Sequence, residues 1–88
     1  MGFRKNVSEA LELPKEIMLG LPLLSLMGRE ELSVENYKGI LEYGEECLRI
    51  GTASGILTVT GEGLCLCRMT AEILVVTGRL RGLEFAEE

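Results

Sequence analysis

The chain has 88 residues, nine of them Lys or Arg against fourteen Glu, with no Asp, His or Trp and a formal net charge of −5. This length allows one small domain with a single core, and an acidic chain lacks the basic surface that nucleic-acid binding requires. The most apolar window, residues 17–27, is interrupted by Gly20 and Pro22 and is too short for a transmembrane helix, so we expect no membrane span.

Residues 1–21 differ from the rest of the chain and predict a helical or flexible N-terminal segment. Asn6 with Glu9 three residues later is typical of a capping box at the start of a short helix over residues 7–12, which Pro14 then interrupts. A helix this short is not stable alone, so the segment must either dock on the rest of the domain or remain mobile. Peripheral membrane binding by this segment is a further alternative, since an aromatic and two basic residues lie near its start.

From residue 32 onward the chain repeats about every sixteen residues. The three units read LSVENYKGILEYGEE, LRIGTASGILTVTGEG and LCLCRMTAEILVVTGRL, and each predicts two strands of about five residues. The stretches NYKG, TASG, GEG and TGRLRG supply the Gly and Asn that tight turns require. A first strand is expected at residues 23–26 and a last one at residues 80–85. Residues 22–88 are therefore predicted to form a single all-β domain with three hairpin-like repeats.

Two architectures can use such a repeat. Consecutive hairpins give a small antiparallel meander of about seven or eight short strands that forms a sandwich or open barrel, and this is the fold class we expect. Coils stacked in register would instead give a short β-solenoid, for which about three units is the minimum.

Alternation along the strands divides the side chains between two faces. The face opposite the core changes from polar to apolar along the chain, since Ser33 and Arg49 in the first two units correspond to Cys65 in the third. A solvated face has no physical reason to become apolar at one end, so we expect something to cover the third unit. The core face is expected to hold Leu32, Val34, Leu41, Tyr43, Leu48, Ile50, Leu57, Val59, Leu64, Leu66, Leu74 and Val76.

The covered end of the second face is the candidate binding site. Its cover is either the N-terminal segment or the surface of a protein partner, which includes a second copy of the chain. In the N-terminal segment the candidate contacts are Val7, Leu11, Ile17 and Met18. The residues expected to bind a partner are Cys65, Cys67, Met69 and Val75.

The stretch LCLCRMT, residues 64–70, places Cys65, Cys67 and Met69 on one side of a strand. A thiol-based metal-binding or redox protein that also uses Cys47 is therefore the alternative function. A structural zinc site needs four Cys or His ligands, and this chain has three Cys and no His, so cysteines buried as small hydrophobic residues are the preferred interpretation. Without His there is no ordinary base for a nucleophile. We expect no enzyme activity, no catalytic residues, no cofactor and no metal site.

Four motifs occur in a fixed order along the chain. They are LP-x-x-I-x-L-x-LP at residues 13–22, EN-x-x-GI at 35–40, LRI-x-T-x-x-G at 48–55, and EILVVTGRLRGLEF at 72–85. Together they resemble the pattern of the YabP/YqfC family of sporulation proteins. The cysteine pair at residues 65 and 67 is not part of that pattern, which weakens the metal hypothesis.

The resemblance implies a small non-enzymatic protein of endospore-forming Firmicutes that acts as an interaction or scaffold module in spore formation. It also implies a membrane-anchored sporulation partner of the YqfD type. The expected location is the cytoplasm of the mother cell, or the periphery of the forespore membrane. An odd number of cysteines, expected to be free thiols, agrees with a reducing compartment.

Overall fold

The computed structural model describes residues 20–87, and the predicted N-terminal helix lies outside the described residues. Residues 20–87 form six strands and no helix. The strands are β1 (Leu23–Met27), β2 (Glu31–Glu35), β3 (Tyr37–Tyr43), β4 (Cys47–Thr52), β5 (Gly55–Met69) and β6 (Ile73–Ala86). They form one antiparallel sheet in the order β1-β2-β6-β5-β4-β3, so the expected all-β antiparallel class is confirmed.

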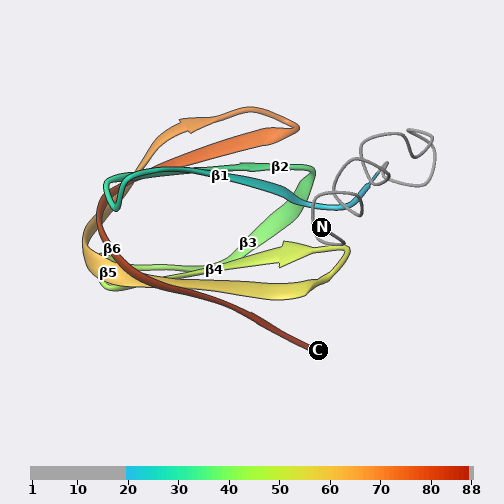
Figure 1. The fold of residues 1–88 in the computed structure, drawn as a ribbon. Coiled ribbons are helices and arrows are strands. Elements are labelled where there is room, and N and C mark those ends of the chain that lie inside the picture. Colours follow the sequence, from blue (N-terminus) through green and yellow to red (C-terminus); the bar gives the residue numbers. More distant parts are fainter. Residues whose placement is uncertain (1–19, 88) are drawn as a thin grey trace, which may run out of the picture.

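The sheet bends back on itself through its two longest strands, β5 and β6, and so forms two layers (Figure 1). The first layer contains β1, β2, the N-terminal half of β6 and the C-terminal half of β5. The second layer contains β3, β4, the N-terminal half of β5 and the C-terminal half of β6. Each layer covers the apolar face of the other, which is how a single sheet of this size buries a core.

The bend takes the place of two predicted turns. GEG and TGRLRG lie inside β5 and β6, so residues 20–87 form six strands rather than the expected seven or eight. Gly63 and Gly78 have positive φ angles of 62° and 135°, which residues with a side chain rarely adopt. A Cβ atom at Gly78 would lie 2.7 Å from the carbonyl oxygen of Gly63. These glycines therefore let the paired strands β5 and β6 approach each other closely and bend together, and neither strand ends at the predicted turn.

The first predicted hairpin is wrong, because β2 and β3 do not pair with each other. A single residue, Asn36, joins them with a φ of 66° and carries the chain from the first layer to the second. Its N–H donates to the Glu72 carbonyl at 2.8 Å, and its side-chain amide donates to the Leu21 carbonyl at 2.9 Å. The other two units do contain hairpins, β4 with β5 and β5 with β6. The all-antiparallel pairing of the six strands excludes the solenoid alternative.

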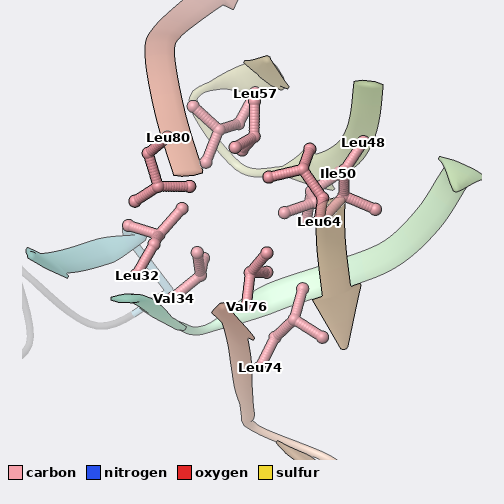
Figure 2. Close-up of a cluster of buried hydrophobic side chains, with 10 residues drawn as sticks. Leu32, Val34, Leu48, Ile50, Leu57, Leu64, Leu74, Val76 and Leu80 are labelled. Atoms are coloured by element: carbon pink, nitrogen blue, oxygen red, sulfur yellow. The ribbon is translucent and has the colours of Figure 1, made fainter. Parts of the chain in front are cut away.

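Ten apolar residues from both layers form the core, and their side chains point toward one another between the layers (Figure 2). Nine of them belong to the predicted core face, and Leu66 packs against the cluster partly buried. Burying a Leu or Val side chain fully contributes about 1.5 to 3 kcal/mol. The members are Leu32, Val34, Leu48, Ile50, Leu57, Val59, Leu64, Leu74, Val76 and Leu80.

Strand β3 departs from the predicted alternation. Its pairing with β4 shifts between Tyr37 and Gly39 and again between Ile40 and Glu42, so every third residue faces the core. Leu41, expected in the core, is 57% exposed, and Ile40 packs against the core instead. Tyr43 lies opposite buried Leu48 but is more than half exposed. The prediction that Leu41 and Tyr43 are core residues is therefore wrong.

Candidate interaction surface

Three of the four predicted partner-binding residues lie together on the side of the first layer that points away from the core. Cys65 is the cross-strand partner of Thr77, and the Cys67 Sγ lies 3.0 Å from the Thr77 Oγ1. Val75 lies two residues before Thr77 on the same strand and therefore on the same face. The structure thus brings Cys65, Cys67 and Val75 together on one surface.

Met69 lies on the other side of the strand. The pairing of β5 with β6 shifts between Leu66 and Arg68, after which Met69 pairs with Leu74. Residues directly opposite each other share a face, so Met69 lies on the side of buried Leu74, although it remains more than half exposed. The predicted row of three sulfur atoms on one face is therefore wrong, because a β-bulge at this point reverses the alternation.

We call the surface of the first layer that points away from the core the outer face. Its central row, Ser25, Ser33 and Val75, is uncharged and ends in Arg68 at the edge. In the second layer the corresponding row is Glu42, Arg49, Thr58 and Glu84, with an ion pair of 3.7 Å between Glu42 and Arg49. The remaining residues of the outer face are Leu23, Met27, Glu31, Glu35, Cys65, Cys67, Ile73 and Thr77.

Cys65 and Cys67 are exposed, whereas Val75 is half-buried. No residue between 20 and 87 covers the two thiols, so a cover for this end of the face stays a prediction. The change from polar to apolar residues does not run along one continuous face. Ser33 lies beside Val75 in the first layer, whereas Arg49 and Thr58 lie in the second.

The hairpin tip next to the two cysteines is held by a network of hydrogen bonds. The Thr70 Oγ1 accepts the N–H groups of Ile73 at 2.9 Å and Glu72 at 3.2 Å, and the Thr70 N–H donates to the Ile73 carbonyl. The Tyr37 hydroxyl of β3 donates to the Thr70 carbonyl, and the Tyr43 hydroxyl accepts the Leu66 N–H at 3.1 Å. These bonds tie the hairpin to the other layer. Alternation places Tyr37 and Tyr43 on one face with or without the bulges, but it gives no signal for the backbone groups that their hydroxyls bind.

The thiol-based alternative gains no support from the geometry. All three cysteines are free thiols, and Cys47 lies on β4 in the second layer, away from the Cys65 and Cys67 hairpin. A shallow depression of about 420 Å³ is lined by Cys47, Glu42, Glu45, Glu46 and Glu62 among others. Even so, no three His, Cys, Asp or Glu side chains within residues 20–87 are arranged to hold a metal ion.

Sequence analysis did not single out β1 as a surface feature. Leu23, Leu26 and Met27 are all more than half exposed on this edge strand. The signal was available, since LLSLM contains no charged residue. Between residues 20 and 87, no helix is both long and apolar enough to cross a membrane.

The architecture defines a small two-layer antiparallel β-protein with an outer sheet face, whose central row is charged only at Arg68, and exposed sheet edges. A family model described as the YabP family matches residues 22–88, which include all six strands, so the chain belongs to the YabP family. The family membership expected from the four motifs is confirmed. The chain is also similar to a Bacillus subtilis (strain 168) protein named "Uncharacterized protein YqfC", with 27% identity over 92 residues that cover 99% of each chain. No solved structure matches it.

Proposed function

We propose that this chain is a non-enzymatic interaction module that acts in endospore formation and binds a membrane-anchored sporulation protein of the YqfD type. Membership of the YabP family supports the place in sporulation. The observation that carries the binding role is the outer face, where exposed Cys65 and Cys67 lie beside half-buried Val75.

The outer face has the properties of the centre of a protein interface. Interface centres are depleted of charged residues, and the central row of this face carries charge only at its edge, on Arg68. The hairpin that presents the thiols is fixed by the Thr70 and tyrosine hydrogen bonds. A rigid surface loses little conformational entropy on binding, which favours affinity.

The proposed location follows from the proposed partner. A membrane-anchored partner would hold the chain at the forespore membrane, on the side of the mother-cell cytoplasm. In this proposal the chain contributes a binding face and no chemistry of its own.

The test is the Cys65→Glu variant in the host that encodes the chain. Cys65 is exposed, so the variant should fold normally, with a thermal midpoint close to that of the wild type. Burying an unpaired carboxylate under a partner is costly, so partner affinity should fall about tenfold or more. We expect the count of heat-resistant spores to fall toward that of a strain lacking the gene.

The matched control is Thr60→Glu, which adds the same charge to an exposed position on the second layer. We expect this control to sporulate like the wild type. An unchanged spore count in the strain lacking the gene would contradict the role in sporulation. Normal sporulation of the Cys65→Glu variant would contradict binding through the outer face.

A further inference from the structure

Strand β1 is an edge of the sheet that lacks the usual protection. It pairs with β2 on one side, and no residue between 20 and 87 pairs with its other side. Such an edge presents unpaired backbone N–H and C=O groups that a further strand can bind. We propose that β1 pairs antiparallel with β1 of a second copy, which makes the protein a twofold-symmetric homodimer.

The other exposed edges carry features that discourage strand addition. Strand β3 contains Lys38, Glu42 and two β-bulges. The C-terminal half of β5 contains Arg68 and a bulge, and the C-terminal half of β6 contains Glu84. Charged side chains and bulges are the common means by which proteins block edge-to-edge pairing. Strand β1 has neither, because its five residues are uncharged and pair with β2 without a register shift.

Three of the four exposed side chains of β1 are apolar, and the fourth is Ser25. Leu23 is 54% exposed, Leu26 is 56% exposed and Met27 is 68% exposed. Leu23 and Met27 lie on the outer face, whereas Leu24 and Leu26 lie opposite buried Val34 and Leu32 and face the core side. Covering these side chains is favourable, and a second strand beside β1 would cover both sets at once.

The sequence of β1 is complementary to itself. A twofold axis through Ser25 would place Leu23 opposite Met27 of the second copy and Leu24 opposite Leu26 of the second copy. Every cross-strand pair is then apolar with apolar, apart from the central pair of serines, which can form a hydrogen bond. The symmetry keeps each face continuous, so the outer faces of both copies lie on the same side of the extended sheet.

The second copy would also cover a depression next to β1. Leu26 lines a depression of about 290 Å³ together with Leu80 and Leu83. In the proposed register Leu24 of the second copy lies beside Leu26, at the rim of this depression. A five-residue strand pair is a small interface, so we expect reversible association in the micromolar range rather than an obligate dimer.

The test measures the oligomeric state of the full chain by sedimentation velocity across micromolar concentrations. We expect the wild type to change from monomer to dimer as its concentration rises. Ser25→Lys should remain monomeric, because the register places two like charges directly opposite each other. Ser54→Lys is the matched control, since Ser54 is exposed in the β4–β5 turn, and it should dimerise like the wild type.

A charge-reversal experiment tests the register itself. Ser25→Glu alone should also be monomeric, and a mixture of Ser25→Lys with Ser25→Glu should restore a dimer, because the opposite charges then pair. Three results would overturn the proposal: a wild type that stays monomeric throughout, a Ser25→Lys variant that dimerises normally, or a mixture that fails to dimerise.

Discussion

Gly61 shows how a single residue determines the shape of the fold. A Cβ atom at this position would overlap the carbonyl oxygen of Arg79, which lies on the neighbouring strand β6 at the bend. The same Cβ would lie 3.0 Å from the Leu64 side chain in the core. The backbone of β5 can approach β6 this closely only because residue 61 has no side chain.

We therefore expect Gly61→Ala to lower the free energy of unfolding by roughly 2 kcal/mol or more, as overpacking in a core does. Gly39→Ala is the control, because no heavy atom lies within 4 Å of a Cβ at that position. Urea unfolding followed by circular dichroism measures both variants. Equal stability of the two variants would contradict the close approach of the β5 and β6 backbones at Gly61.

In strand β3 the residues that face the core do not follow the alternation that the sequence predicts. The two β-bulges give it a repeat of three, so Tyr37, Ile40 and Tyr43 lie opposite buried residues of β4. The bulge residues Lys38 and Leu41 are then left on the outside. The alternation of the sequence alone favours Leu41 as the buried residue, which is the opposite of what the structure shows.

The two neighbouring residues provide a direct comparison. Ile40→Ala should lower the free energy of unfolding by roughly 1 to 3 kcal/mol, because Ile40 packs against the core. Leu41→Ala should change it by less than about 0.5 kcal/mol, because the side chain is mostly exposed. Denaturant unfolding of the two variants is the measurement. A larger loss for Leu41→Ala would mean that β3 alternates regularly.

The successes and failures of sequence analysis share one physical origin. Strand segments with regular alternation, such as β2, β4 and the start of β6, place nearly all their apolar residues as predicted. Gly also permits a bend within a strand, so the glycines of GEG cannot be distinguished by composition from those of a turn. A bulge leaves no signature in alternation, so the position of Met69 could not be predicted from its spacing to Cys65 and Cys67.

At the scale of the whole molecule, folding over of the sheet makes the two layers chemically different. The second layer presents a charged row with an ion pair, whereas the first presents a central row that is charged only at Arg68, beside two free thiols. Cys65, Cys67 and Val75 could be assigned to one surface from the sequence, because the hairpin that carries them is local. The extent of that surface could not be predicted, because it depends on the pairing of β1 with β2 and of β2 with β6, and β2 and β6 are distant in the sequence.

The central claim, that the outer face binds a protein partner, is tested most directly by the reactivity of its own thiols. The full chain would be captured with the proposed membrane-anchored partner from sporulating cells, and alkylation of each cysteine would be followed by mass spectrometry. Pairing through β1 would leave the thiols open, since β2 and β6 separate β1 from β5. We predict that Cys65 and Cys67 react rapidly in the free protein and become protected in the complex. Equal reactivity of both thiols in the free and the bound protein would contradict the claim.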